Sequence, residues 1–291
     1  MAGVAASGRR RSKIAPYLMC LPAIAYLLIF FVIPLFTLLK TSLSVNTGSI
    51  FLPKLEFQWQ WSNYHSAFTD YNEQIVRSFE YAAIATLISL ALAYPLAYFI
   101  AFKAGRAKNF MLGLVILPFF VTFLVRTLAW KTLLSDDGAV VSFLTTIHLI
   151  PGEGRILSTS AGVINGLVYN FLPFMILPIY VSLEKIDLRL IEAARDLYSS
   201  SRRAFLKVVL PLSLPGVFAG TLLTFIPASG DFINAEYLGS TQTTVIGTVI
   251  QKQFLVVKDY PTAAALSFVL MTIILIMVLI YSKVLGTEDL V

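Results

Sequence analysis

The sequence predicts an all-α integral membrane protein with six transmembrane helices. Of its 291 residues, 57% are hydrophobic and only 13% are charged, and the mean hydropathy is +0.80. A soluble domain carries about 25% charged residues, so this composition excludes a soluble fold. Six apolar stretches are each long enough to cross a hydrocarbon core of about 30 Å. They are Ala15 to Leu39, Phe79 to Phe102, Phe110 to Trp130, Ala161 to Leu183, Val208 to Ile226 and Ala263 to Tyr281.

Lys and Arg are distributed unevenly among the segments between these stretches. Most of them lie in the amino terminus, the second and fourth connections and the carboxyl terminus. By the positive-inside rule, both termini and the fourth connection are predicted to be cytoplasmic. The net charge of +6 is thereby explained, and the expected partner is the lipid membrane and not a nucleic acid. We expect a basic tail over residues 1–14, one six-helix domain over 15–285 and a second cytoplasmic tail over 286–291.

Prolines and aromatic residues characterise the first part of the chain. Pro22 and Pro34 predict kinks in the first apolar stretch. The external connection that follows, residues 40–78, is rich in Trp and Tyr. This composition predicts an aromatic belt with a short surface helix, and a surface for an external partner is the alternative.

The third stretch carries Arg126 and Trp130 near its external end. A charge at bilayer depth needs a physical reason. One is snorkelling of the guanidinium to the nearby membrane surface. The other is a position that lines a translocation pathway, with the charge paired to Glu80, Asp136 or Asp137. The sequence leaves both open.

The fourth stretch contains Asn165 and Tyr169, which are four residues apart and therefore share a helical face. Polar side chains on one face predict that this face does not point at lipid. It is a candidate for lining a translocation pathway, and a polar contact between two helices is the alternative.

After the fifth stretch, Pro227 and Gly230 predict the end of the helix. The residues that follow are expected in irregular or re-entrant backbone, which is tolerated at membrane depth where protein buries it or it lines a wet cavity. Carboxylates beside aromatic rings suit an amine cation, through charge pairing and cation–π contact. Capping and structuring of the segment is the alternative role. The residues concerned are Asp231, Asn234, Glu236 and Tyr237.

The fourth connection, residues 184–207, is the only long charged run between two apolar stretches. Apolar residues recur there at steps of three and four, which predicts an amphipathic helix with Asp187 as its N-cap. The apolar face is expected to consist of Leu183, Ile186, Leu190, Ala194 and Leu197. A helix with one apolar and one charged face is a docking surface for a partner.

Within this connection, Glu192-Ala193-Ala194 is followed by a helix end and then by Leu210-Pro211 and Pro215-Gly216. This pattern resembles the EAA loop of permease subunits in binding-protein-dependent ABC importers. In that family the loop forms the coupling helix, which sits in a groove of the cytoplasmic ATPase. The resemblance implies a type I ABC importer permease fold with a cytoplasmic coupling helix. It assigns ATPase coupling to Asp187, Glu192, Ala193, Ala194, Asp196 and Leu197.

One position departs from the family pattern, because Tyr198 stands where the family usually has Gly. Gly suits the left-handed conformation at a helix C-terminus, which costs other residues about 1–2 kcal/mol. Either Tyr198 adopts this conformation or the helix ends differently here.

Further stretches resemble the spermidine/putrescine permease subgroup, and in particular its B-type subunit: residues 93–98, 125–130, 225–239 and 246–254. The resemblance implies a polyamine as substrate and a place in the bacterial plasma (inner) membrane. It also implies three kinds of partner: a second homologous permease subunit in a heterodimer, two cytoplasmic ATPase subunits and an extracytoplasmic substrate-binding protein. The expected substrate pathway consists of Arg126, Trp130, Asn165, Tyr169, Asp231, Asn234, Glu236 and Tyr237.

The chain carries no phosphate-binding loop, nucleophile elbow or zinc-protease motif, so neither catalysis nor a cofactor is expected, and ATP would be bound by partner subunits. His65 and His148 have no second ligand at metal spacing. Two alternatives remain. One is a permease for another small solute, such as iron or an amino acid-like compound. The other is an ion-gradient-driven secondary carrier, which would need inverted repeats that the sequence does not show.

Overall fold

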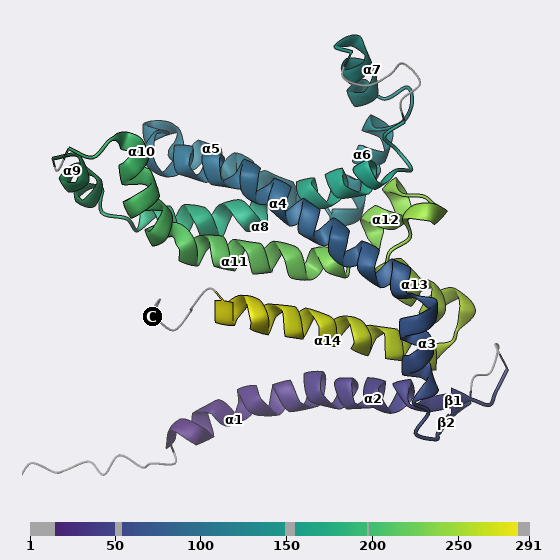
Figure 1. The fold of residues 1–291 in the computed structure, drawn as a ribbon. Helices are drawn as coiled ribbons and strands as arrows, with labels where there is room; N and C mark the ends of the chain where they lie inside the picture. The colour runs from purple at the N-terminus through teal and green to yellow at the C-terminus, as the bar shows by residue number, and fades with distance from the viewer. Residues whose placement is uncertain (1–14, 50–53, 149–154, 197, 285–291) are drawn as a thin grey trace, which may run out of the picture.

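The computed structural model describes residues 15–49, 54–148, 155–196 and 198–284. Long helices run side by side, and short elements lie at both ends of the bundle (Figure 1). Among the described residues, five helices are long and apolar enough to cross a membrane, or six if one bent pair counts as a span. The predicted class of membrane protein is therefore confirmed.

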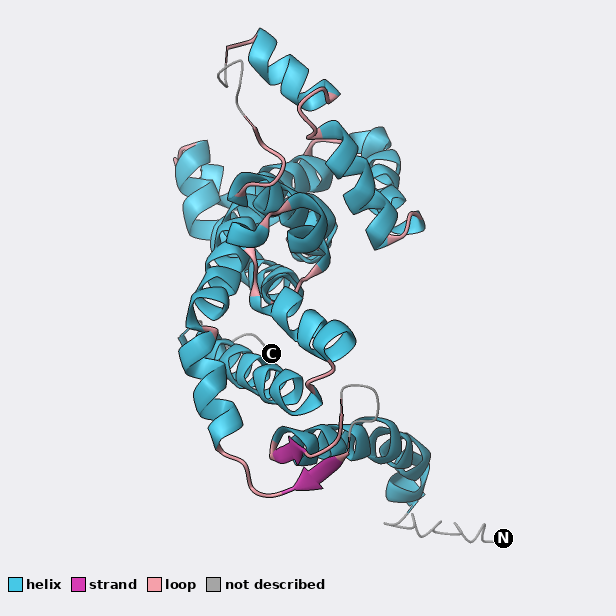
Figure 2. Ribbon diagram, turned by 90° about the vertical axis from the view of Figure 1, so that its right-hand side faces the viewer, coloured by secondary structure: helices cyan, strands magenta, loops and turns pink. Residues whose placement is uncertain are grey.

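The first span consists of α1 (Ala15–Leu27), the π-helical turn η1 (Leu28–Val32) and α2 (Ile33–Ser42). It packs mainly on its neighbour α14 (Tyr260–Val284) and leaves most of its surface uncovered. A two-stranded antiparallel sheet follows, formed by β1 (Ser44–Asn46) and β2 (Leu55–Phe57) (Figure 2). This hairpin of two three-residue strands is a local addition to a mostly helical chain, so the predicted all-α class is confirmed. The predicted short surface helix is present as α3 (Ser62–Asp70).

The centre of the bundle consists of α4 (Asn72–Phe102), α8 (Ser160–Glu184) and α11 (Leu210–Ser229). The backbones of α11 and α8 approach closely at Gly216 and Gly220. A Cβ at Gly216 would lie 2.5 Å from the backbone oxygen of Pro178, and one at Gly220 would lie 2.9 Å from the sulfur of Met175. Small residues four apart permit such close contact between membrane helices.

The third span is broken, which corrects the prediction of one continuous helix over Phe110–Trp130. Residues Gly105–Phe120 form η2 (Gly105–Ala107), α5 (Lys108–Ile116) and η3 (Leu117–Phe120), and α6 (Phe123–Leu133) follows at an angle of 96°. Pro118 lacks the N–H that would continue the α-helix, and Val121 and Thr122 are extended. The short helix α7 (Ala139–Thr146) comes next.

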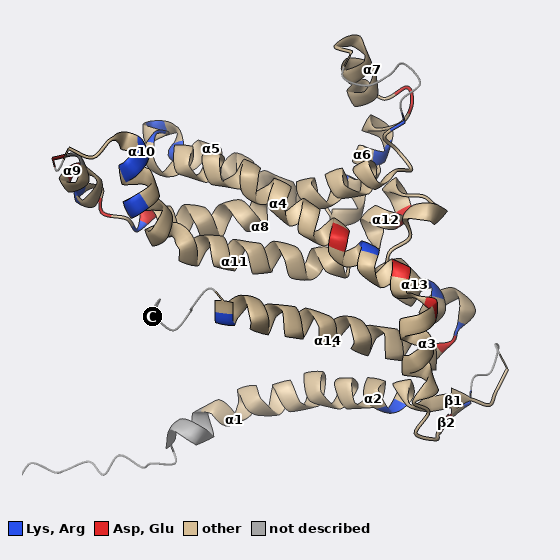
Figure 3. Ribbon diagram, in the orientation of Figure 1, with Lys and Arg blue, Asp and Glu red and all other residues tan. Residues whose placement is uncertain are grey.

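One end of the bundle carries α9 (Leu188–Asp196), α10 (Ser201–Ala204) and the π-helical turn η4 (Phe205–Val209), which continues into α11. Here an ion pair joins the start of α5 to the end of α8, because Lys108 Nζ lies 2.6 Å from Glu184 Oε1. Figure 3 shows Lys and Arg gathered around α10 and the start of α5.

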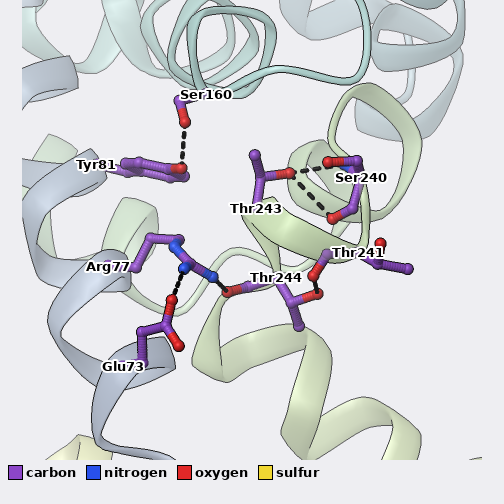
Figure 4. A network of polar contacts seen from close by, with 8 residues as sticks. All are labelled: Glu73, Arg77, Tyr81, Ser160, Ser240, Thr241, Thr243 and Thr244. Atoms are coloured by element: carbon purple, nitrogen blue, oxygen red, sulfur yellow. Dashed lines mark hydrogen bonds and ion pairs between the residues drawn. The ribbon is translucent and has the colours of Figure 1, made fainter.

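The opposite end carries α12 (Ile233–Leu238), η5 (Thr241–Thr243), α13 (Ile246–Lys252) and η6 (Gln253–Val257). Figure 4 shows how α4 holds the loop before α13. Arg77 Nη1 donates to the backbone oxygen of Thr244 at 2.9 Å, and its Nη2 pairs with Glu73. Tyr81 Oη and Ser160 Oγ, 2.5 Å apart, join α4 to the start of α8. Polar contacts thus fix this end of the bundle.

Candidate functional site: helix α9 and a polar junction

Helix α9 begins as the sequence predicts. Asp187 Oδ1 accepts a hydrogen bond from the backbone N–H of Arg189 at 2.9 Å, which is the geometry of an N-cap. Ile186 is buried and Ile191 packs against the bundle core. Leu190 is predicted on this buried face but is 49% exposed, because Ile191 and not Leu190 faces the bundle.

The residues expected to contact an ATPase lie mainly on the outer surface of α9. Glu192, Ala193 and Asp196 are exposed and Ala194 is half-buried. Leu197 lies outside the described residues, so its predicted contact is not described. A short helix with exposed polar and apolar side chains projects from the bundle at this end (Figure 1).

The end of α9 answers the question raised by Tyr198. Its φ is 57°, so Tyr198 adopts the left-handed conformation itself. The N–H of Ser199 donates to the carbonyl of Ala194 at 3.1 Å, which is the long hydrogen bond of a Schellman motif. The helix therefore ends in the family's manner without glycine, and the Tyr198 side chain is 98% exposed.

At the opposite end of the bundle, three helices meet in a buried cluster that we call the polar junction: Thr127 of α6, Asn170 of α8 and Asn234 of α12. The side-chain amide of Asn170 donates to Thr127 Oγ1 and to Asn234 Oδ1, both at 3.1 Å. Thr127 Oγ1 also lies 3.3 Å from Asn234 Oδ1. Each such bond contributes about 0.5–1.5 kcal/mol net, so the cluster holds the bent third span against α8 and α12.

The pathway prediction included Asn234 but neither Thr127 nor Asn170. The signal that could have found Asn170 is a second amide in an otherwise apolar helix, one residue after Tyr169. Asn165 does not join the junction. Its Nδ2 is buried and has no hydrogen-bond partner among the described residues.

Arg126 and Trp130 lie on α6 beside the junction. The ring of Trp130 meets that of Tyr169 edge to face, with centroids 5.3 Å apart, so this predicted pair does come together. Arg126 is only 7% exposed, so protein encloses most of it, which favours the pathway alternative over snorkelling. The predicted ion pairs with Glu80, Asp136 or Asp137 are not formed, because Asp136 pairs with Arg155 and no ion pair of Arg126 is found among the described residues.

Arg126 is held by aromatic rings. Its guanidinium carbon lies 5.5 Å from the ring centre of Phe123 and 6.0 Å from that of Phe119, while Nε and Nη1 are buried without hydrogen-bond partners. Burying a charge costs several kcal/mol, and each unmade hydrogen bond adds about 1–3 kcal/mol. A cation–π contact returns about 2 kcal/mol when desolvated, so the two rings offset only part of this cost.

After α11, residues Ile233–Leu238 form helix α12, which corrects the prediction of irregular backbone for Asn234, Glu236 and Tyr237, whereas Asp231 lies outside any helix as predicted. Asp231 Oδ1 accepts from the N–H of Asn234 at 2.8 Å, so the capping role is present. Burial raises the pKa of Asp231, which lies beyond the end of the spanning helix, to about 6. Glu236 Oε2 lies 3.6 Å from Lys252 Nζ, and the Tyr237 ring lies under Lys131, at 5.8 Å. Of the four residues predicted to bind an amine, Glu236 and Tyr237 thus face basic side chains in this structure.

No group of three or more His, Cys, Asp and Glu side chains that could hold a metal ion is found in the parts of the chain that the structure describes. Spanning helices, an exposed amphipathic helix at one end and a buried polar junction at the other define a membrane transport subunit. The chain belongs to the family of binding-protein-dependent transport system inner membrane components, whose model matches residues 93–284.

Relatives of known role and solved structures agree with this family. The spermidine/putrescine transport system permease protein PotB of Escherichia coli K12 is 37% identical over 264 residues, which cover 90% of this chain and 95% of that protein. PotB of Salmonella typhimurium LT2 is 41% identical over 211 residues, covering 72% and 74%. A bacterial ABC transporter that imports the acidic polysaccharide alginate has a chain of similar fold, with a TM-score of 0.65, 20% identity and coverage of 93% and 94%. A bacterial alginate ABC transporter in complex with an alginate pentasaccharide-bound periplasmic protein gives a TM-score of 0.64 at 19% identity, with coverage of 92% and 93%.

These findings confirm the predicted type I ABC importer permease fold and a multi-pass location in the inner membrane. The chain is a transport component that works with partner proteins, and not an enzyme. They also decide against the self-contained secondary carrier, because members of this family are parts of binding-protein-dependent systems.

Proposed function

We propose that this chain is a permease subunit that forms half of the translocation pathway for a polyamine, such as spermidine or putrescine, in an ATP-driven importer. The observation that supports the substrate class is the 37% identity to a spermidine/putrescine permease over 90% of this chain. A single six-helix domain over residues 15–285 carries the pathway, and the other half comes from a second, homologous permease subunit. Iron or amino acid-like solutes are the competing substrates.

The orientation follows from charge. Lys and Arg gather at the end that carries α9 and α10 (Figure 3), and positively charged connections stay in the cytoplasm. Both termini and the loop over residues 184–207 are then cytoplasmic. The polar junction lies near the external side, where an extracytoplasmic binding protein delivers the solute.

Two cytoplasmic ATPase subunits bind and hydrolyse ATP, one of them docking on α9. The exposed side chains of Glu192, Ala193 and Asp196, with Ala194 at their edge, are suited to that contact. Asp187 acts by capping the helix. Closure of the ATPases moves α9 and thereby switches the bundle between inward and outward access.

The solute path runs along α6, α8 and α12. Trp130 and Tyr169 offer ring faces to an ammonium group, and Asp231, Glu236 and Tyr237 offer negative charge and a further ring. Because Glu236 lies near Lys252 in this structure, a cation must displace that lysine to bind there.

The substrate is tested by uptake in cells that lack their own polyamine importers, with the whole transporter expressed. Labelled spermidine or putrescine should accumulate in an ATP-dependent manner, and unlabelled polyamines should compete while amino acids and iron complexes do not. Accumulation that amino acids or iron abolish, with polyamines inert, would reject the substrate assignment.

Coupling is tested by Ala194→Trp, which places a bulky ring on the ATPase-facing side of α9. Uptake should fall by about tenfold or more while ATP hydrolysis continues, since a mismatched contact of this kind costs more than about 1.4 kcal/mol. The matched control is Ala91→Trp, at an exposed position of α4. Normal uptake by the Ala194→Trp variant would reject α9 as the coupling element.

A further inference from the structure

The region of the polar junction has an excess of unpaired hydrogen-bond donors. Three buried donor nitrogens there lack a partner among the described residues, against one buried acceptor, Asn170 Oδ1. The donors are Arg126 Nε, Arg126 Nη1 and Asn234 Nδ2. The two arginine donors do not depend on how an asparagine amide is oriented. An acceptor-rich group is therefore what this region lacks.

The charge of Arg126 points the same way. A guanidinium keeps its proton in proteins, so Arg126 cannot escape burial by becoming neutral, as a lysine can. A cation that is 7% exposed and rests on the rings of Phe119 and Phe123 lacks a counter-ion. Buried charges in membrane proteins pair with an opposite charge or line a solute path.

Three carboxylates near α6 and α12 are already engaged with other groups of this chain. Asp136 and Glu236 lie against basic side chains, and Asp231 accepts from the backbone of α12. Among the three guanidinium nitrogens of Arg126, Nε and Nη1 are buried without a partner, and Nη2 is not one of these buried atoms. The Nη2 edge of the guanidinium is therefore the one that an incoming group can reach. A planar fork of donors fits the two oxygens of a carboxylate.

We propose that Arg126 is a carboxylate-binding site, whose ligand comes from outside this chain and pairs with the guanidinium during transport. This inference rests on the proposed translocation path beside α6. The carboxylate has two possible sources, a side chain of the second permease subunit or the transported solute. A polyamine carries no carboxylate, so with polyamine transport the source is the second subunit.

The test uses the whole transporter with Arg126→Gln and Arg126→Lys, and with Arg155→Gln as the matched control, since Arg155 is exposed. Removing one member of a buried charge pair should lower uptake by about tenfold or more, with the lysine variant in between. The control should stay within about twofold. Uptake by Arg126→Gln within about twofold of the wild type would overturn the proposal.

Two arms distinguish the sources. In the first, Arg126→Asp is combined with Asp→Arg or Glu→Arg changes in the second permease, and assembly is measured by thermal unfolding of the complex. Restored assembly identifies a subunit carboxylate. In the second, putrescine and 4-aminobutyrate are compared, because they differ at one end only, where a carboxylate replaces the terminal CH2–NH3+ group of putrescine. A loss of preference for 4-aminobutyrate in Arg126→Gln identifies the solute.

The charge-exchange experiment measures assembly and needs no particular substrate, so it can give a positive result even when polyamine uptake fails. The carboxylate site at Arg126 and the polyamine substrate are therefore tested separately. If the Arg126→Gln and Arg126→Lys variants do not assemble, the proposal is tested by the charge exchange and by the binding of putrescine and 4-aminobutyrate to the wild-type transporter. If no exchange restores assembly and 4-aminobutyrate stabilises the wild type no better than putrescine, the carboxylate site is overturned.

Discussion

Tyr198 shows what one residue costs at the end of a functional helix. It holds a left-handed backbone with φ of 57°, and its side chain is 98% exposed, so no contact of that side chain accounts for the conformation. The hydrogen bond from Ser199 to Ala194 maintains it. Strain is thus stored where α9 would meet its partner.

We expect Tyr198→Gly to stabilise α9 by about 0.5–1 kcal/mol. Relief of about 1–2 kcal/mol of left-handed strain exceeds the added chain entropy of glycine in the unfolded state, about 0.4–1 kcal/mol. Hydrogen exchange of the α9 amides should slow accordingly. Tyr198→Ala is the control, because it keeps a Cβ and therefore the strain. Equal protection in both variants would contradict this explanation.

Asp231 predicts a pH dependence of stability. Its pKa is raised to about 6 in the folded protein by burial, against 3.8 for the ordinary side chain. Between these values the folded state binds more protons than the unfolded state, so the free energy of unfolding should fall as pH rises and level off above about 6. Thermal unfolding over pH 4–7 measures this.

The matched variant is Asp231→Asn, which keeps an acceptor for the N–H of Asn234 and removes the titration. Its stability should lack the fall seen in the wild type. An identical pH profile in the two proteins would assign the dependence to other groups.

At the scale of the elements, the contact between α8 and α11 depends on glycine. Gly216→Ala would place a Cβ 2.5 Å from the oxygen of Pro178, and backbone cannot move away as a flexible side chain can. We expect a loss of about 1–3 kcal/mol, measured as a lower midpoint of thermal unfolding.

Gly113→Ala is the control for the α8–α11 prediction, since a Cβ at Gly113 of α5 meets nothing within 4 Å. It should be neutral or slightly stabilising, by up to about 1 kcal/mol, because alanine favours helix more than glycine does. A control as damaging as Gly216→Ala would mean that close packing is not the cause.

Two π-helical turns lie before prolines in the spans and explain how these two prolines, Pro34 and Pro211, are accommodated. The turns Leu28–Val32 and Phe205–Val209 each end two residues before a proline, Pro34 and Pro211. A wider turn is one way of absorbing the clash between a proline ring and the preceding carbonyls. The kink expected at Pro34 is thus a local widening within a continuous span, Cys20–Ser42.

Hydropathy predicted the spans well, because length and apolar composition are enough to define a membrane helix. It failed in the third span, where residues 117–121 are apolar throughout and composition cannot tell a straight helix from a bent one. Pro118 was the only local signal. The hairpin of β1 and β2 escaped notice because each strand has only three residues.

The candidate site was harder to predict than the fold. Asp187 and Tyr198 could be placed because caps depend on neighbouring residues in the sequence. The polar junction joins Thr127, Asn170 and Asn234 across more than one hundred residues of sequence. No local sequence pattern encodes such a contact, because it depends on the bend that places α6 across the end of α8.

For the whole molecule, the charge distribution predicts which side each end faces. In a Cys20→Ser background, which removes the only cysteine, Glu192→Cys should react with a membrane-impermeant maleimide in inverted vesicles and not in intact cells. Thr241→Cys, exposed at the opposite end, should show the reverse. Labelling of position 192 in intact cells would refute the orientation.

The helical segments Gly105–Phe120 and Phe123–Leu133 meet at an angle of 96°, so together they have the shape of a crank. Helix α5, before the bend, is joined to the end of α8 near α9 by the ion pair of Lys108 and Glu184. Helix α6, after the bend, carries Arg126 and Thr127. Rotation of a straight helix about its own axis leaves both ends in place, whereas the same rotation of a bent pair moves the second helix sideways. A small rotation of α5 at the α9 end would thus move α6 at the opposite end of the bundle without any helix having to slide.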